Sequence, residues 1–181
     1  MLIVLGGLLG SGRIYLANKL ALTYGVYPYD LNSKKVPLPM FDTDGNVRTR
    51  VPKNKQERLR VYDKVLEDLP FASKMHPNIL IHDTFHRQMP REYFLEKAKE
   101  ICSPVVFIWI EAGEEYVITN MNYLHKRGVI KDVDAALRYR ELRKKKLQPC
   151  PPSVPRFHTT TMSATHVEDL WQLIQDQVNS G

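Results

Sequence analysis

The segment "LIVLGGLLGSGRIY" at residues 2–15 constrains the fold of this chain more than any other feature. Apolar residues open directly into glycines, and a helical pattern follows over 12–24. A buried strand, a glycine turn and a helix N-terminus in this order form a site that favours the binding of an anion. The curled backbone points N–H groups inward, and the helix end adds partial positive charge. The segment predicts a phosphate-binding loop over 7–13, with a tight turn lacking a ligand as the alternative.

The spacing within the loop matches a known phosphate-loop pattern, in which four residues separate two glycines and Lys and Ser or Thr follow. Gly7 and Gly12 take the glycine positions, but the next residues are Arg13 and Ile14. Arg13 keeps the positive charge on a bulkier planar group, whereas Ile14 lacks the hydroxyl that ligates Mg²⁺. The predicted nucleotide-binding residues are Gly7, Leu8, Leu9, Gly10, Ser11, Gly12, Arg13 and Ile14.

Strand and helix patterns alternate along the whole chain. Strands are expected at 2–5, 26–30, 78–83, 104–111 and 156–161, and helices at 12–24, 54–75, 90–102, 113–128, 132–147 and 165–178. This alternation predicts an α/β three-layer sandwich, with a mostly parallel five-stranded sheet between helices on both faces. We expect one domain over 1–181. The Pro-, Asp- and Gly-rich segment 31–52 is expected to be an insertion near the substrate site, either a hairpin or an ordered loop.

Composition narrows the class of protein. The chain has 181 residues, of which 43% are hydrophobic, so it is too apolar for a disordered chain. No apolar run approaches the about 20 residues that span a bilayer. With no targeting segment visible, we expect a cytoplasmic monomer or homodimer without a membrane partner. Cys102 and Cys150 lack metal-ligand spacing and are expected to be free thiols. The net charge of +6 suits phosphorylated ligands and nucleic acid alike.

Carboxylates follow two of the predicted strands, at the sheet edge where ligands bind in parallel sheets. Asp30 is expected to accept the proton of an acceptor hydroxyl, and Lys34 and Lys35 to bind an anionic substrate. Asp30 as the cap of a turn is the alternative. Asp83 is expected to hold a magnesium ion indirectly, through its water shell.

The helices over 113–147 are rich in Lys and Arg and predict a small basic lid. Arg127 and Arg138 are the residues we expect to close over a transferring phosphate, acting with Arg13 as catalytic cations. A solvated helix face is the alternative for each lid arginine. His86 has no metal-ligand partners in the sequence and is interpreted as a surface or hydrogen-bonded histidine.

Taken together, "VLGGLLGSGRIYLANKLA", "YDLN", "LIHDTF" and the basic lid resemble a small P-loop kinase. The chain is similar to the AAA-like or zeta-toxin-like kinases, which include polynucleotide and sugar kinases of nucleoside-monophosphate-kinase architecture. The resemblance implies ATP bound at 7–13, Mg²⁺, an acceptor-side base at Asp30, a metal-side carboxylate at Asp83 and lid arginines near 127–143. The chain departs from the family at Arg13, at Ile14 and near Asn120, where the family carries an arginine.

We therefore expect an ATP-binding kinase that transfers a phosphoryl group to a hydroxyl of a small molecule or a nucleic-acid end. The acceptor is not identified by the sequence. The altered loop leaves a catalytically impaired nucleotide-binding module as one alternative. The basic segments leave a nucleic-acid-binding protein as another, less favoured because acidic residues interrupt them and stacking aromatics are lacking.

Overall fold

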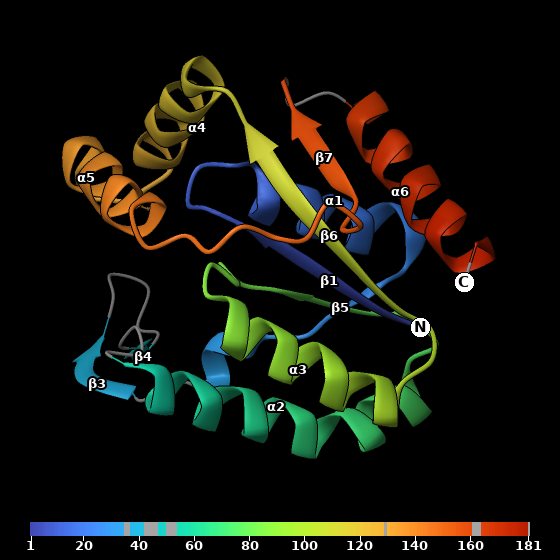
Figure 1. Ribbon diagram of the computed structural model, residues 1–181. Coiled ribbons are helices and arrows are strands. Elements are labelled where there is room, and N and C mark those ends of the chain that lie inside the picture. Colours follow the sequence, from blue (N-terminus) through green and yellow to red (C-terminus); the bar gives the residue numbers. More distant parts are fainter. Residues whose placement is uncertain (35–36, 42–46, 50–53, 129, 161–163, 181) are drawn as a thin grey trace.

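The computed structural model describes residues 1–34, 37–41, 47–49, 54–128, 130–160 and 164–180. Within these residues, five parallel strands form one sheet in the order β2-β5-β1-β6-β7 (Figure 1). The strands are β1 (Leu2–Gly7), β2 (Tyr27–Pro28), β5 (Ile79–His82), β6 (Val105–Ala112) and β7 (Arg156–Thr159). With helices on both faces, this arrangement confirms the predicted α/β three-layer sandwich.

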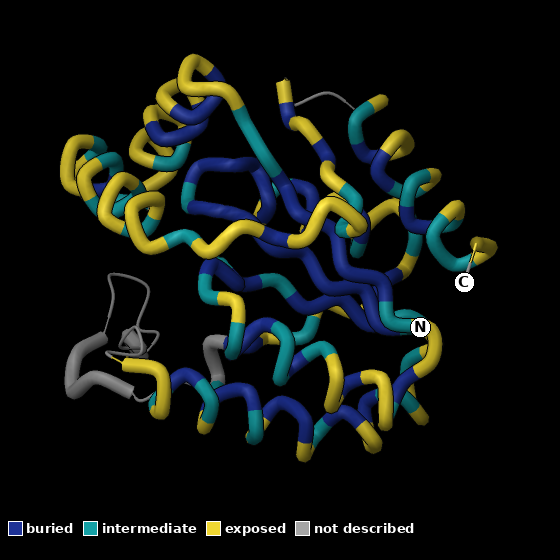
Figure 2. The backbone as a smooth tube through the Cα atoms, viewed as in Figure 1, coloured by how far each residue is buried: buried dark blue, intermediate teal, exposed yellow. Residues whose placement is uncertain are grey.

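β1 lies at the centre of the sheet because it is apolar on both faces. Leu2, Ile3, Val4 and Leu5 have no exposed surface. Leu2 and Val4 belong to one buried cluster, and Ile3 and Leu5 belong to a second cluster. Figure 2 shows the buried strands between helices whose outer faces are exposed. A strand buried in this way requires a helical layer on each side of the sheet.

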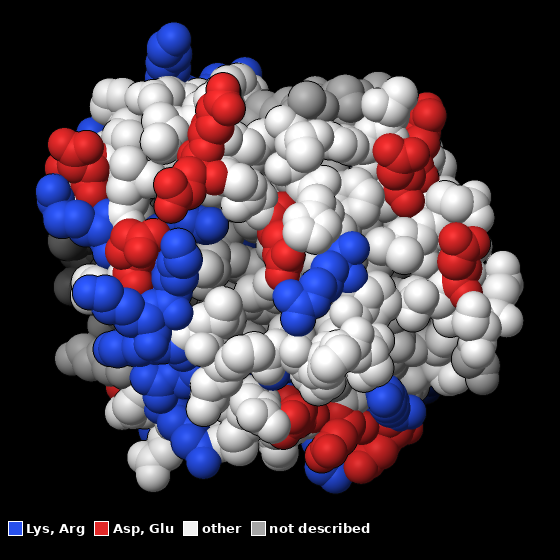
Figure 3. Space-filling model, turned by 45° about the horizontal axis from the view of Figure 1, so that its top comes forward, with Lys and Arg blue, Asp and Glu red and all other residues white. Residues whose placement is uncertain are grey.

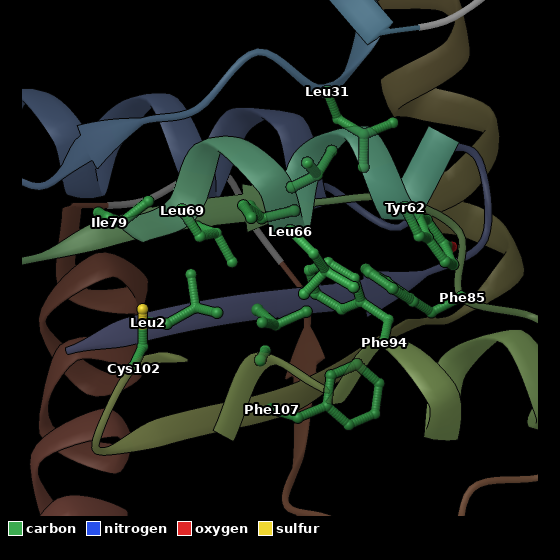
Figure 4. Close-up of a cluster of buried hydrophobic side chains, with 14 of the residues drawn as sticks. Leu2, Leu31, Tyr62, Leu66, Leu69, Ile79, Phe85, Phe94, Cys102 and Phe107 are labelled. Atoms are coloured by element: carbon green, nitrogen blue, oxygen red, sulfur yellow. The ribbon is translucent and has the colours of Figure 1, made fainter. Parts of the chain in front are cut away.

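Helices cover the two faces in pairs (Figure 1). The helices concerned are α1 (Arg13–Tyr24), α2 (Lys55–Met75), α3 (Gln88–Ile101) and α6 (Ala164–Asn179). α2 and α3 bury the first cluster, which includes Tyr62, Phe94 and Phe107 (Figure 4). α1 and α6 bury the second cluster on the opposite face. α1 ends at Gly25 in the left-handed conformation, as the sequence predicts.

α4 (Glu114–Lys126) and α5 (Val133–Lys144) are the two helices of the segment predicted to be the lid, and the name lid is kept for them here. They pack on each other through a small cluster of Val117, Met121 and Ala136, separate from the two main clusters. Asp132 caps α5, because its side chain accepts a hydrogen bond from the Ala135 N–H at 2.9 Å. Figure 3 shows Lys and Arg side chains gathered along the side of the molecule that α5 occupies.

Two segments differ from the expected pattern. β2 is shorter than the strand predicted at 26–30, because Pro28 has no N–H to donate and β2 pairs with β5 alone. The segment 31–52 contains η1 (Leu31–Lys34) and the antiparallel pair β3 (Pro37–Phe41) and β4 (Val47–Thr49). The described strands therefore favour the hairpin, and 35, 36, 42–46 and 50–52 lie outside the described residues.

Both cysteines are buried free thiols, as expected. Among the helices of the described residues, none combines the length and the apolar character needed to cross a membrane.

Candidate functional site

The glycine loop lies at the carboxyl end of β1 and is packed closely beneath the lid. Gly10 and Gly12 have φ values of 83° and 84°, which only glycine adopts without strain. A Cβ at Gly10 would lie 2.8 Å from Met121 Cε, and one at Gly12 would lie 2.6 Å from the Tyr116 hydroxyl. Both positions therefore require glycine for its conformation and for its lack of a side chain.

Side chains from three elements bind the carbonyl groups of the loop. The Arg13 guanidinium donates to the Gly7 carbonyl, Arg140 of α5 donates to the Leu9 carbonyl, and Asn120 of α4 donates to the Gly10 carbonyl at 3.1 Å. Gly12 is the N-cap of α1 and offers no side-chain cap. The N–H groups of the first helical turn consequently remain available to an anion.

Several buried polar atoms around the loop have no hydrogen-bond partner among the described residues. They are Ser11 Oγ, Arg13 Nε, the Tyr116 hydroxyl and Thr159 Oγ1. Buried polar groups in folded proteins nearly always have a hydrogen-bond partner, so four such atoms near one loop are unusual. Their gathering at one loop indicates a site that a polar ligand completes.

A cavity of about 220 Å³ opens between the loop and α4. It is lined by Leu8, Leu9, Gly10, Ser11, Gly12, Arg13, Ile14, Tyr15, Asn18, Asn120, Tyr123, Leu124 and Arg127. The structure thus brings Arg127 to the predicted loop, where its guanidinium lies 5.9 Å from the centre of the Tyr123 ring. Arg138 is exposed on α5 and is not among the lining residues.

Arg13 does not extend into open solvent as a long surface side chain would. It is 8% exposed, and burial lowers the pKa of its guanidinium while the nearby Asp83 carboxylate opposes that shift. Its bond to the Gly7 carbonyl fixes the cation at the base of the loop. The charge predicted from the sequence is therefore present, held against the end of β1.

Asp83 follows β5 directly and is bound by two side chains of α2. Its carboxylate pairs with the Arg58 guanidinium and accepts a hydrogen bond from the Tyr62 hydroxyl at 3.1 Å. Burial works against the charge of Arg58, but Asp83 and Tyr62 outweigh it and raise the pKa of Arg58. Burial and the Asp83 carboxylate also raise the pKa of Tyr62. The Arg58–Asp83 pair is therefore ionised and closed to solvent.

No role was assigned to Arg58 or Tyr62 in the sequence analysis. In the structure Arg58 is 6% exposed and Leu59 is more exposed. The spacing of Arg58 and Tyr62 is the sequence signal that could have identified them. The arginine lies one helical turn before the tyrosine, so both fall on the apolar face of the helix.

His86 and Arg143 extend the same polar cluster. The His86 ring is hydrogen-bonded to Thr84 Oγ1 at 2.9 Å, and the Arg143 guanidinium lies 3.4 Å from its Nε2. Arg143 can only donate, so Nε2 is the acceptor and Nδ1 carries the proton. Burial, with Arg58 and Arg143 nearby, lowers the pKa of His86 to about 4. His86 is therefore a neutral, hydrogen-bonded histidine at pH 7.

Arg91, which the sequence analysis did not single out, binds the loop that follows β5. It is 1% exposed and donates to the carbonyls of Phe85, Gln148 and Pro149 at 3.0–3.1 Å. It joins the loop after β5 to the segment after α5. Phe85 has a φ of 44°, which is rare for a bulky residue and occurs where the surroundings impose it. Arg91 thereby fixes the strained loop that carries Asp83 and His86.

The predicted acceptor-side residues lie on the other side of β5. Asp30 is exposed just after β2. Lys34 forms an ion pair with Asp68 of α2, and Asp68 also accepts a hydrogen bond from the Tyr29 hydroxyl at 2.6 Å. The structure therefore places Lys34 against α2 rather than at the glycine loop. Lys35 lies outside the described residues.

The residues present do not fit a magnesium ion held by the protein. Mg²⁺ requires oxygen ligands in near-octahedral geometry. Ile14 offers no oxygen, and the Asp83 carboxylate is engaged by Arg58 and Tyr62. Within the part of the chain that the structure describes, no three His, Cys, Asp or Glu side chains gather as a metal site.

Comparison with known proteins finds matches to the fold of this chain but none to its sequence. The sequence matches no protein-family model and no curated protein. Solved structures match over nearly the whole chain. A sugar kinase from Janibacter sp. has a TM-score of 0.64 and 15% identity, covering 98% of this chain and 96% of its own. This chain has a P-loop kinase-like fold.

Two further structures support that conclusion. A gluconokinase from Sinorhizobium meliloti 1021 has a TM-score of 0.63 and 14% identity, over 99% of this chain and 96% of that one. Kti12 from Chaetomium thermophilum, in complex with ADP-AlF3, has a TM-score of 0.61 and 18% identity, over 98% and 99%. At these identities the likeness concerns the P-loop kinase-like fold and leaves the substrate of this chain open.

Proposed function

We propose that this protein binds ATP at residues 7–13 and transfers its terminal phosphoryl group to a hydroxyl of a small molecule. The observation that carries the proposal is the glycine loop itself, where Ser11 Oγ and Arg13 Nε have no partner among the described residues and the N-terminus of α1, which has no side-chain cap, lies beside a cavity. Sugar kinase, gluconokinase and ADP-bound Kti12 structures of the same fold support a nucleotide as the ligand.

The predicted catalytic and acceptor-side residues have the following roles in this proposal. Arg13 stabilises the phosphate chain from the base of the loop, and Arg127 and Arg138 of the lid neutralise charge as the lid closes. Asp30 accepts the proton of the acceptor hydroxyl, and Lys34 with Lys35 binds an anionic group of the acceptor once Lys34 leaves Asp68. No step is assigned to Mg²⁺, because the donor set at Ile14 and Asp83 does not fit it.

A phosphorylation screen tests the proposal. The protein is incubated with ATP and a panel of sugars, sugar acids, nucleosides and oligonucleotides with free hydroxyl ends, and products are identified by mass spectrometry. Wild type is expected to phosphorylate a member of the panel, and Asp30→Ala to lose the activity. Asp169→Ala, which removes an exposed carboxylate of α6, is the matched control and keeps it. Transfer by Asp30→Ala at the wild-type rate would reject Asp30 as the base.

A catalytically impaired nucleotide-binding module is the second candidate. Three positions favour it: Arg13 bonded to the Gly7 carbonyl, Ile14 without a hydroxyl, and Asp83 engaged by Arg58. This candidate predicts ATP binding without transfer to any acceptor. The double variant Arg13→Lys, Ile14→Thr is then expected to gain metal-dependent ATP affinity. An unchanged affinity would argue that the loop is only structural.

A further inference from the structure

The polar cluster at the base of the glycine loop contains more positive than negative charge. Arg13 enters it from α1, Arg58 from α2 and Arg143 from α5. Asp83 is the acidic group there, and it pairs with Arg58. His86 is neutral, and the Glu141 carboxylate of α5 lies 4.0 Å from the Lys144 ammonium. Among the described residues, three guanidinium groups thus share the Asp83 carboxylate, which pairs with Arg58 and also acts on the charge of Arg13.

Arg13 and Arg143 make their direct contacts with uncharged groups. Arg13 bonds the Gly7 carbonyl, while its Nε has no partner among the described residues. Arg143 lies over the Tyr139 ring at 4.9 Å and beside His86. Arg13 is buried and Arg143 is half-buried, and an excess of positive charge away from water is unfavourable because the lost hydration is not fully repaid. The cluster therefore favours the binding of an anion.

Backbone hydrogen bonds place the cluster directly against the glycine loop. The Gly7 N–H donates to the Thr84 carbonyl at 3.3 Å, and the Asp83 N–H donates to the Leu5 carbonyl at 3.2 Å. Arg140, one helical turn before Arg143 on the same face of α5, binds the Leu9 carbonyl. Arg13 lines the cavity beside the loop, and Arg143 follows Arg140 on the face of α5 that meets the loop.

We propose that Arg13 and Arg143 bind the phosphate chain of a nucleotide in its metal-free form, in place of a protein-held magnesium ion, with Arg58, paired to Asp83, beside them in the arginine cluster. This inference rests on the proposed function, namely that the loop binds a nucleotide. Guanidinium groups bind phosphate oxygens through paired N–H donors. They also repel a divalent cation at short range. Metal-free ATP is more negative than its magnesium complex, so the cluster favours the free form.

Calorimetric titration of the full chain with ATP tests the inference, in EDTA and in excess Mg²⁺, with tripolyphosphate as a second probe. Binding in EDTA is expected to be about tenfold tighter than in Mg²⁺, which is about 1.4 kcal/mol. Tripolyphosphate without metal is expected to bind at the same site and compete with ATP. Tighter ATP binding in Mg²⁺ would overturn the inference while leaving the nucleotide site in place.

Variants of α5 identify the cations responsible. Arg143→Gln is expected to weaken binding of metal-free ATP by about tenfold to a hundredfold, as for a lost hydrogen bond to a charged group. Arg143→Lys keeps the charge without the paired donors and is expected to restore part of the loss. Lys144→Gln removes the same charge from an exposed neighbour and is expected to have no effect. Equal effects of Arg143→Gln and Lys144→Gln would reject the cluster as the binding site.

The remaining outcomes separate the two proposals. If tripolyphosphate binds and ATP does not, the arginine cluster is an anion site, but both its nucleotide ligand and the proposed function are rejected. If neither probe binds in EDTA, the inference is overturned. ATP binding only in Mg²⁺ would also overturn it and would return the site to ordinary metal-dependent nucleotide binding.

Discussion

Replacing Gly12 with alanine tests how tightly the loop is packed beneath the lid. Gly12 has a φ of 84°, and an added Cβ would lie 2.6 Å from the Tyr116 hydroxyl and 3.0 Å from Thr159 Cγ2. Gly25, at the other end of α1, is the matched control. Its φ is 64°, and a Cβ there would meet nothing within 4 Å. The two substitutions share the backbone strain and differ in the steric clash.

The magnitudes follow from this difference. Left-handed backbone costs a residue with a Cβ about 1–2 kcal/mol, and the loss of glycine freedom in the unfolded chain returns about 0.4–1 kcal/mol. Gly25→Ala is therefore expected to lower the free energy of unfolding by about 1 kcal/mol. At Gly12, overpacking adds about 1–3 kcal/mol, for a total of about 3 kcal/mol. For a chain of this length, the melting temperature falls by about 3 °C and about 9 °C respectively.

Urea denaturation followed by circular dichroism measures both losses. Tyr116→Phe removes the hydroxyl that the new Cβ would meet, and that hydroxyl has no hydrogen-bond partner among the described residues. In the double variant with Gly12→Ala, part of the cost is expected to disappear, by about 1 kcal/mol or more. Equal losses for Gly12→Ala and Gly25→Ala, or strict additivity with Tyr116→Phe, would refute the packing described for the loop.

Three further predictions concern the polar cluster. Arg91→Lys keeps the charge but not the fork that reaches three carbonyls, so urea denaturation should show a loss of about 3 kcal/mol; a loss below about 1 kcal/mol would contradict the bracing role. The pKa of His86 is about 4 in the folded protein, against an ordinary value of 6.5. Its contribution to the free energy of unfolding is therefore complete above pH 6.5 and is lost as the pH falls toward 4. Between pH 6.5 and pH 4, the free energy of unfolding of His86→Gln should therefore fall by up to about 3 kcal/mol less than that of wild type. Parallel pH profiles of the two proteins would argue against a neutral His86. Asp83→Asn leaves Arg58 buried without its carboxylate and should cost about 3–5 kcal/mol in denaturant titration, whereas an unchanged midpoint would mean that the pair is not closed to solvent.

The sequence predicted the fold because its main features are local. Four consecutive apolar residues predict β1 as a buried strand. Gly25 ends α1 through its own backbone conformation, and Asp132 begins α5 through the cap that its own side chain makes. The glycine loop was predicted for the same reason. Its residues are consecutive, and their conformation depends on glycine rather than on distant partners.

The arginine partners of the site were not predicted because they depend on contacts between distant segments. Arg58 is 25 residues from Asp83 in the chain, and nothing in α2 alone distinguishes it from a surface arginine at the edge of an apolar stripe. Arg91 binds carbonyls 57 and 58 residues away. Such pairings follow from the strand order, in which β5 lies between β2 and β1, and that order is a property of the whole sheet.

Backbone hydrogen exchange with and without ATP is the most direct test of the central claim, that the loop binds a nucleotide. The claim predicts slower exchange over residues 8–15, where loop and helix N–H groups face the ligand, and over 120–127 of α4, which lines the same cavity. The outer helix α3 serves as the internal reference and should not change. Protection confined to other segments, or no protection at saturating ATP, would contradict the claim.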